Sequence, residues 1–170
     1  LKPTEVYEYF DGIERYTWND YSYYGDLIEQ QVYVDDSNYV ATELEYHPEY
    51  ALEISRTSWQ GLNKTGEKVQ KISVYGNYDG TENQNGEYLV KEKVLLYDGD
   101  PNDPNDNLWA VTSYEYYNAD YKKGLVKEIT DPEGFATVID YDDYGYKKLV
   151  SKGNDPNNVE PVERYCNDAI

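Results

Sequence analysis

The feature of this sequence that most restricts its fold is an internal repeat of about two dozen residues. The segment Thr112-Ser113-Tyr114-Glu115-Tyr116 is matched 25 residues later by Thr137-Val138-Ile139-Asp140-Tyr141. The pair Leu125-Val126 likewise returns as Leu149-Val150, 24 residues on. Leucines in matching positions lie further upstream, at Leu27, Leu52 and Leu89. A repeat of this length is one supersecondary unit, so its copies must pack against their neighbours to be stable.

Each copy has the pattern of a β-hairpin. A first strand ends in an aromatic residue, a turn rich in Gly, Asn and Asp follows, and a second strand starts at the leucine. In Tyr114-Glu115-Tyr116 the rings alternate with a carboxylate, which places the rings on one face of a strand. Asp-Pro turns such as Asp131-Pro132 then lead into the next hairpin. We expect strands over residues 6–10, 16–18, 27–34, 40–46, 69–75, 88–97, 109–117, 125–130 and 136–141.

The repeat predicts an all-β fold, with successive β-hairpins forming an open, curved antiparallel sheet. About five hairpins fit into residues 1–170, which we expect to form a single β-repeat domain. Residues 77–87 would lengthen one hairpin loop and residues 98–107 one connection, because loops accept insertions at small entropic cost. The chain starts at Leu1 without Met, so we expect a processed chain or a piece of a longer protein.

The composition is acidic and rich in tyrosine. The chain of 170 residues has a formal net charge of -19 and contains 22 Tyr but only 2 Phe and no Met. High charge favours disorder, but disordered chains are poor in aromatic residues, and here 16% of the residues are aromatic. The negative charge argues against binding nucleic acid, and no apolar stretch is long enough for membrane insertion.

The best copies of the repeat resemble the YD repeat of the RHS family. Its units run roughly as Tyr-x-Tyr-Asp, Gly, a basic residue and Leu, then a strand and Asp-Pro-x-Gly. Residues 139–150 match this order, and the copy that starts at Tyr114 ends in Asp131-Pro132-Glu133-Gly134. The resemblance is specific over residues 109–157 and loose before them. Tyr146-Lys147 replaces the usual Arg after the turn glycine, and upstream copies lack Tyr-Asp.

This resemblance implies a non-catalytic scaffold and not an enzyme. Members of the family are mostly secreted or surface-attached bacterial proteins whose hairpins spiral into a hollow shell. Five hairpins are too few to close a shell, so the chain would be an open sheet or a segment of such a spiral. We therefore expect a structural or adhesive role at the cell surface or outside the cell. Its partners would be other segments of the parent chain, or a protein or glycan at the surface.

A carbohydrate-binding module is the alternative that the aromatic residues leave open. Rings on an exposed sheet face can stack on sugars or grip a protein partner. The candidate binding residues are Trp18, Trp59, Trp109, Tyr116 and Tyr141. The other interpretation of these rings is structural, since tyrosine tolerates half-exposure and can fill the packed face of a sheet.

An acidic run in the longest connection raises the question of a metal. The candidate calcium ligands are Asp98, Asp100, Asp103 and Asp106. An EF-hand counted from Asp98 would need Gly at its sixth place and Glu at its twelfth, where the sequence has Asp103 and Trp109. Two successive Asp-Pro-Asn turns are the simpler interpretation of the run, so we expect no cofactor, with a weak calcium site as the alternative.

Other reactive residues carry weaker signals. Carboxylate pairs such as Glu43 with Glu45, or Glu115 with Asp140, could catalyse glycoside hydrolysis, but solvated strand faces also carry such pairs. His47 lacks a second histidine with which to share a metal, and Cys166 is the only cysteine.

Overall fold

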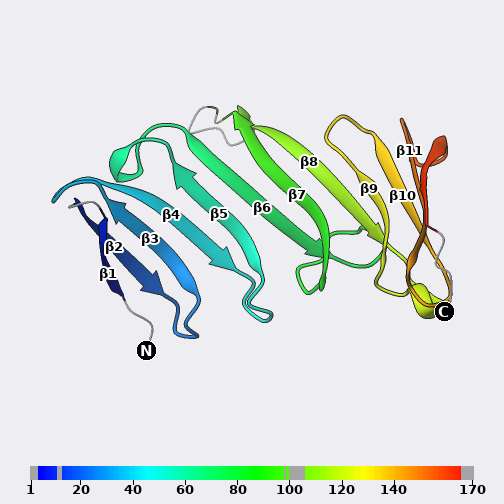
Figure 1. Cartoon of the computed structure of the whole chain (residues 1–170), viewed down its shortest axis with the longest axis horizontal. Coiled ribbons are helices and arrows are strands. Elements are labelled where there is room, and N and C mark those ends of the chain that lie inside the picture. Colours follow the sequence, from blue (N-terminus) through cyan, green and yellow to red (C-terminus); the bar gives the residue numbers. More distant parts are fainter. Residues whose placement is uncertain (1–3, 11–12, 98, 100–105, 166–170) are drawn as a thin grey trace. The chain divides into compact units, whose positions relative to one another are not determined.

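The computed structural model describes residues 4–10, 13–97, 99 and 106–165. Twelve strands form one open antiparallel sheet in which each strand pairs with its neighbours in the sequence (Figure 1). The described residues contain no α-helix, which confirms the predicted all-β sheet of successive hairpins. The strands are β1 (Glu5–Phe10), β2 (Ile13–Tyr21), β3 (Leu27–Tyr33), β4 (Tyr39–Tyr46), β5 (Glu53–Trp59), β6 (Lys68–Gly76), β7 (Tyr88–Tyr97), β8 (Leu108–Tyr116), β9 (Val126–Thr130), β10 (Ala136–Tyr141), β11 (Lys147–Gly153) and β12 (Val159–Arg164).

Every range predicted as a strand overlaps one of these strands, but three strands were not among the predicted ranges. The β5 strand alternates mostly polar side chains and therefore lacks an apolar signal. The β11 strand was indicated only by the repeated pair Leu149-Val150. The β12 strand contains Pro161, which is tolerated because β12 is the last strand in the order and pairs on one side only.

The hairpins share a shift of register near the end of the first strand. At four such places an acidic residue is followed by tyrosine, and the returning strand carries one more residue than its partner. These places are Asp20/Tyr21, Glu45/Tyr46, Glu115/Tyr116 and Asp140/Tyr141. A β-bulge of this kind increases the local twist and re-aims the strand before it turns. The sequence repeat is therefore also a repeat of backbone geometry.

A five-residue turn with glycine in its fourth place recurs as well. The amide of the first residue donates to the carbonyl of the fifth, and the glycine amide donates to the carbonyl of the first. The turns are residues 22–26, 77–81, 131–135 and 142–146. Their glycines have φ between 81° and 88°, a conformation that side chains disfavour. In two of them, an aspartate at the first place (Asp131 or Asp142) also accepts two amides of its own turn.

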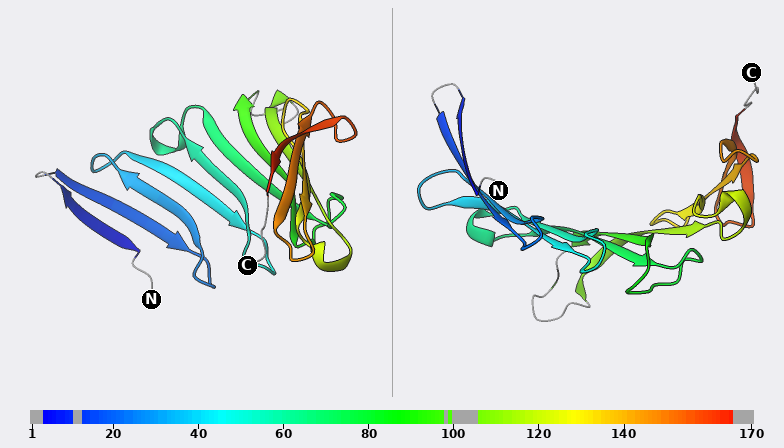
Figure 2. Two further views of the ribbon diagram at one scale, coloured as in Figure 1. Left: turned by 45° about the vertical axis from the view of Figure 1, so that its right-hand side comes forward. Right: turned by 90° about the horizontal axis from the view of Figure 1, so that it is seen from below.

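The chain divides into two compact units. Unit 1 comprises Leu1–Ile72 and Val94–Trp109, and unit 2 comprises Ser73–Lys93 and Ala110–Ile170. In each unit the described strands lie in a single layer (Figure 2). This division reflects where contacts within the chain are dense, and it does not test whether the units fold as one domain. The single β-repeat domain expected from the sequence therefore stays a prediction.

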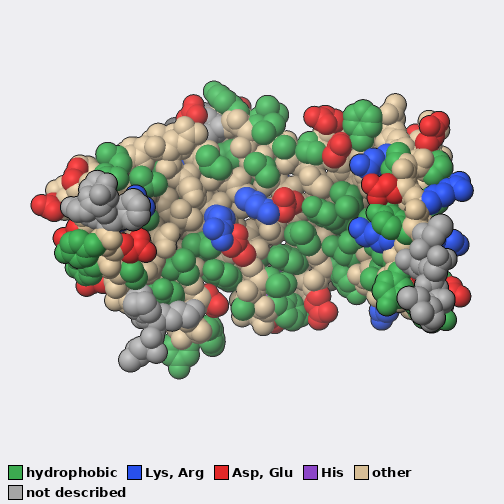
Figure 3. Space-filling view, in the orientation of Figure 1, with side chains coloured by type: hydrophobic (Ala, Val, Ile, Leu, Met, Phe, Trp, Pro, Cys, Tyr) green, Lys and Arg blue, Asp and Glu red, His purple; other side chains and the backbone are tan. Residues whose placement is uncertain are grey.

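A single layer leaves room for only small cores. In unit 2, Ile139, Tyr141 and Val150 form a buried cluster, and partly buried side chains such as Leu125 pack against it. In unit 1, Ala41 and Leu44 of β4 are buried. On the face seen in Figure 3, hydrophobic side chains lie among charged ones and no continuous apolar surface covers the sheet. Most side chains of the strands are accordingly half-buried.

The described residues include no helix long and apolar enough to cross a membrane.

Candidate functional site

Four tyrosine rings form a row across one face of unit 1. The ring centroids of Tyr7 and Tyr16 lie 5.0 Å apart, those of Tyr16 and Tyr33 4.9 Å, and those of Tyr33 and Tyr39 5.4 Å. The rings are tilted by 35° to 46° relative to their neighbours. Such contacts stabilise aromatic pairs by about 0.5–1.5 kcal/mol beyond the area that they bury. We call these four residues the tyrosine row.

The register of three hairpin connections brings the row together. Tyr7 of β1 is directly opposite Tyr16 of β2, and Tyr33 of β3 is directly opposite Tyr39 of β4. The register between β2 and β3 pairs Thr17 with Val32. Tyr16 and Tyr33, one position beyond this pair on each strand, are therefore next to each other, on the sheet face opposite to that of Thr17 and Val32. Residues opposite each other across antiparallel strands share a face of the sheet.

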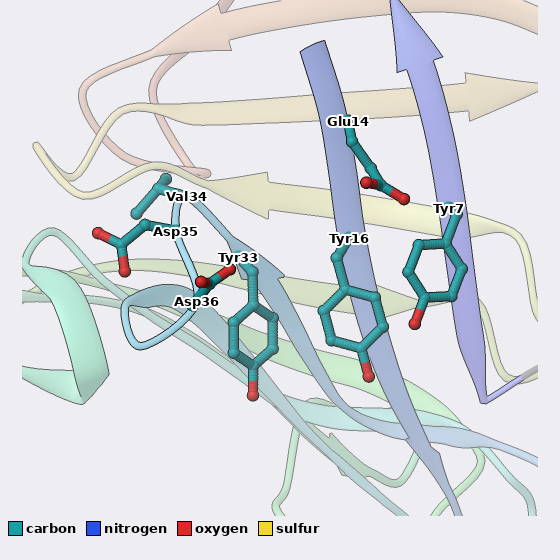
Figure 4. Close-up of a pocket in the computed structure, with 7 residues that line it drawn as sticks. All are labelled: Tyr7, Glu14, Tyr16, Tyr33, Val34, Asp35 and Asp36. Atoms are coloured by element: carbon teal, nitrogen blue, oxygen red, sulfur yellow. The ribbon is translucent and has the colours of Figure 1, made fainter.

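An open groove of about 480 Å³ follows this row. Tyr7, Tyr16 and Tyr33 point to the same side, and the remaining lining residues are Glu14, Val34, Asp35 and Asp36 (Figure 4). We call these seven residues the tyrosine groove. Three of them are acidic and none is basic, so the groove combines aromatic surface with negative charge.

Hydrogen bonds and burial set the charge state of the groove. The side chain of Asn38 and the backbone amides of Ser37 and Asn38 donate to Asp35, which lowers the pKa of this carboxyl. Burial raises the pKa of the Tyr16 hydroxyl, and the charge of Glu5 raises it further. At neutral pH the groove thus holds an ionised Asp35 and a neutral Tyr16.

A second groove, of about 230 Å³, lies on the same face over β4, β5 and β6. It is lined by Trp59 and by polar side chains, namely Glu43, Glu45, Ser55, Thr57, Lys68 and Gln70. We call these residues the Trp59 groove. The register pairs Glu43 with Thr57, Thr57 with Gln70, and Trp59 with Lys68, so one sheet face supplies the whole lining. A ring beside several hydrogen-bonding groups is an arrangement that can hold a polar ligand.

Lys64 anchors the loop between these strands to the sheet. It follows β5 in the short 3₁₀ turn Leu62–Lys64, and its Nζ lies 2.8 Å from Glu29 and 2.6 Å from Glu43. The same Nζ is 5.8 Å from the Trp59 ring centroid, within the range of a cation–π contact. Glu29 and Glu43 are directly opposite each other, so Lys64 neutralises a repulsive pair.

The pKa values reflect this arrangement. Partial burial alone would lower the pKa of Lys64, but hydrogen bonds to Glu29 and Glu43 outweigh it and raise the pKa. Partial burial would raise the pKa of Glu29, but hydrogen bonds from Gln31 and Lys64 outweigh it and lower the pKa.

The structure separates the predicted aromatic residues. Trp18 is half-buried and on the same face as Tyr16, and half-buried Trp59 lines the groove named after it. Half-buried Trp109 lies in β8. Tyr116 and Tyr141 belong to unit 2, where the Tyr116 hydroxyl donates to the carbonyl of Leu89 at 2.8 Å and Tyr141 lies in the buried cluster. A part of these five residues in binding stays a prediction. The positions of Tyr116 and Tyr141 support a structural role for these two.

The predicted calcium ligands can be located only in part. Asp98, Asp100 and Asp103 lie outside the described residues, and Asp106 is exposed. Within the described part of the chain, no three His, Cys, Asp or Glu side chains are grouped so that they could hold a metal ion.

The carboxylates considered for catalysis are mostly paired with lysines. Glu115 contacts Lys127 at 3.0 Å, and Asp140 contacts Lys122 at 2.5 Å. The hydrogen bond from Lys122 lowers the pKa of Asp140. A glycosidase needs one carboxylic acid with a raised pKa, which is the opposite shift. His47 is a turn residue whose Nδ1 accepts the amide of Glu49 and whose ring stacks on Tyr50.

The tyrosine row and Lys64 were not among the residues selected from the sequence. A signal for part of the row exists, because Tyr33 and Tyr39 are symmetric about the turn of residues 34–38. Using it requires the position of this turn to be known to the residue. Lys64 gives no such signal, since its place depends on positive φ angles at Asn63 and Lys64 itself.

No family model matches this chain, and no curated protein matches its sequence.

Lys64, Glu29 and Glu43, which we call the Lys64 cluster, generate a prediction for stability and its pH dependence. Lys64→Met leaves Glu29 and Glu43 opposed without a cation, and we expect unfolding at pH 7 to become easier by about 1 kcal/mol. A lowered carboxyl pKa stabilises the fold above the unfolded-state value near 4.5, and this contribution is lost as the pH falls through the folded-state pKa. In the variant, protonation instead relieves the repulsion. The difference between the two proteins should therefore shrink between pH 7 and pH 4, measured by urea unfolding.

Lys123→Met is the matched control, because Lys123 is exposed and its removal changes the net charge equally. An equal loss of stability in both variants, or a difference that is independent of pH, would contradict the account of the Lys64 cluster.

Proposed function

We propose that this chain is a non-catalytic scaffold of β-hairpin repeats, a structural or adhesive segment of a secreted or surface-attached bacterial protein. The observation that supports this proposal is the recurrence of one hairpin geometry in both units. The bulge at Glu45/Tyr46 in unit 1 has its equivalent at Glu115/Tyr116 in unit 2. Repeats that contact only their neighbours build extended surfaces, which suits a scaffold. Resemblance to the YD repeat of the RHS family adds the extracellular, bacterial setting.

A phase-matched excision tests the scaffold. Removing residues 116–140 joins Glu115 to Tyr141. The result should be a hybrid hairpin made of β8 up to Glu115, the turn of residues 142–146 and β11. Because Glu115 holds the position of Asp140 in its own hairpin, Tyr141 follows it in the correct phase. We therefore expect the shortened chain to fold as a β-protein with a cooperative but lower thermal transition. Circular dichroism and thermal melting measure this. Removing residues 116–141 instead shifts the register by one and exchanges the faces, so this control should not fold.

If the phase-matched variant unfolds as completely as the control, the hairpins are not interchangeable units and the scaffold proposal fails.

The compartment is tested in cells that express the full-length protein. Antibodies raised against this chain should label intact cells or detect the protein in the culture medium. Protease treatment of intact cells should remove the surface label. A cytoplasmic protein serves as the control that resists such treatment. Labelling that appears only after lysis would contradict the extracellular part of the proposal.

Carbohydrate binding is the second candidate, and the Trp59 groove is the observation that favours it. A half-buried ring beside two glutamates, Gln70 and hydroxyl groups offers both a stacking surface and hydrogen bonds for sugar hydroxyls. We expect Trp59→Ala to reduce binding on a glycan array by at least tenfold and Gln70→Ala to reduce it less. Trp109→Ala is the control, because Trp109 is also half-buried but lines neither groove. An array without any ligand, or equal losses in Trp59→Ala and Trp109→Ala, would contradict this candidate.

A further inference from the structure

The tyrosine groove has a chemistry that the scaffold role does not use. Tyr16 and Tyr33 stabilise the sheet through their mutual contact, but Tyr7 at the edge of the row remains 57% exposed. The exposed ring of Tyr7 and the half-buried rings of Tyr16 and Tyr33, which line the groove, offer surface that a ligand can cover.

The charges around the groove select the kind of ligand. Among the residues that the structure describes, its lining includes three carboxylates, from Glu14 on β2 and from Asp35 and Asp36 in the turn after β3, and no basic residue (Figure 4). The faces of tyrosine rings are electron-rich and attract cations, more strongly still when a carboxylate is near. Asp35 and Glu14 accept hydrogen bonds from neutral groups, so a neutral sugar would use the rings but would bring no cation to these carboxylates.

The dimensions favour an extended ligand. Tyr7, Tyr16 and Tyr33 come from three successive strands, so their rings span two strand spacings, or about 10 Å. Side chains at alternate positions of an extended peptide are about 7 Å apart on one side. Two cationic side chains of one peptide therefore fit over the row, with the carboxylates of the turn within reach of their ends.

We propose that the tyrosine groove binds an extended basic segment of a partner protein, whose Arg or Lys side chains lie on Tyr7, Tyr16 and Tyr33 and pair with Glu14, Asp35 and Asp36. This site is independent of the Trp59 groove and of the scaffold role. The net charge of -19 attracts such a segment over a long range, and the rings give it a defined position.

A designed peptide with alternating Gly and Arg, three arginines in all, is the probe. Isothermal titration in 50 mM salt should show one-to-one binding, and the same peptide with neutral citrulline in place of arginine should not bind. We expect Tyr16→Ala to weaken binding about tenfold and Tyr7→Ala and Asp36→Asn about threefold each. Tyr16→Phe, which keeps the ring, should bind nearly as well as the original chain.

Tyr23→Ala is the matched control, because Tyr23 is 97% exposed in the turn after β2 and does not line the groove. Tyr7→Ala keeps the test decisive if Tyr16→Ala disturbs the fold, since Tyr7 lies on the edge strand. Binding that is unaffected by Tyr7→Ala, or that is reduced equally by Tyr23→Ala, would show a general attraction to an acidic surface and overturn the proposal. Binding of neutral glycans to the groove in place of the peptide would also overturn it.

Discussion

Each inner strand of this sheet depends on its two neighbours, and each end strand on one, because a single layer offers no opposing layer against which to pack. Backbone hydrogen bonds across the sheet and side-chain contacts between adjacent strands therefore provide most of the cohesion. The tyrosine row is an example, in which Tyr7, Tyr16, Tyr33 and Tyr39 each contact a ring on the next strand. The buried cluster around Ile139 is small by comparison. Register is consequently the property on which both stability and the two grooves depend.

The hairpins could be predicted from the sequence because their signals are local. Tyr114-Glu115-Tyr116 shows alternation within three residues, and Asp131-Pro132-Glu133-Gly134 contains a complete turn. The structure confirms hairpins at both places. The β5 strand escaped prediction because its alternating side chains are largely polar, and it is held by pairing with β4 and β6 on both sides. Pairing of that kind cannot be seen in the strand's own residues.

The grooves were harder to predict, since they combine residues from several strands. Tyr16 and Tyr33 are 17 positions apart and meet only because the bulge at Asp20/Tyr21 and the turn after it set the register. The sequence directed attention to tryptophans and to the best copies of the repeat. Trp59 does line a groove, whereas Tyr141, from the best copy, is buried in the cluster of unit 2. Residues that define a repeat most clearly are those that hold it together, so they are poor guides to a binding surface.

The scarcity of fully buried apolar side chains also has a thermodynamic consequence. The heat-capacity increment of unfolding arises from apolar surface newly exposed to water, and typical domains show about 12–15 cal/mol/K per residue. In the part of the chain that the structure describes, most strand side chains are half-exposed already in the native state, and few, such as Val90 and Ala136, are completely enclosed. The increment per residue is therefore small and the stability curve broad. The free energy of unfolding of such a sheet should therefore change almost linearly with temperature, and cold should destabilise it little.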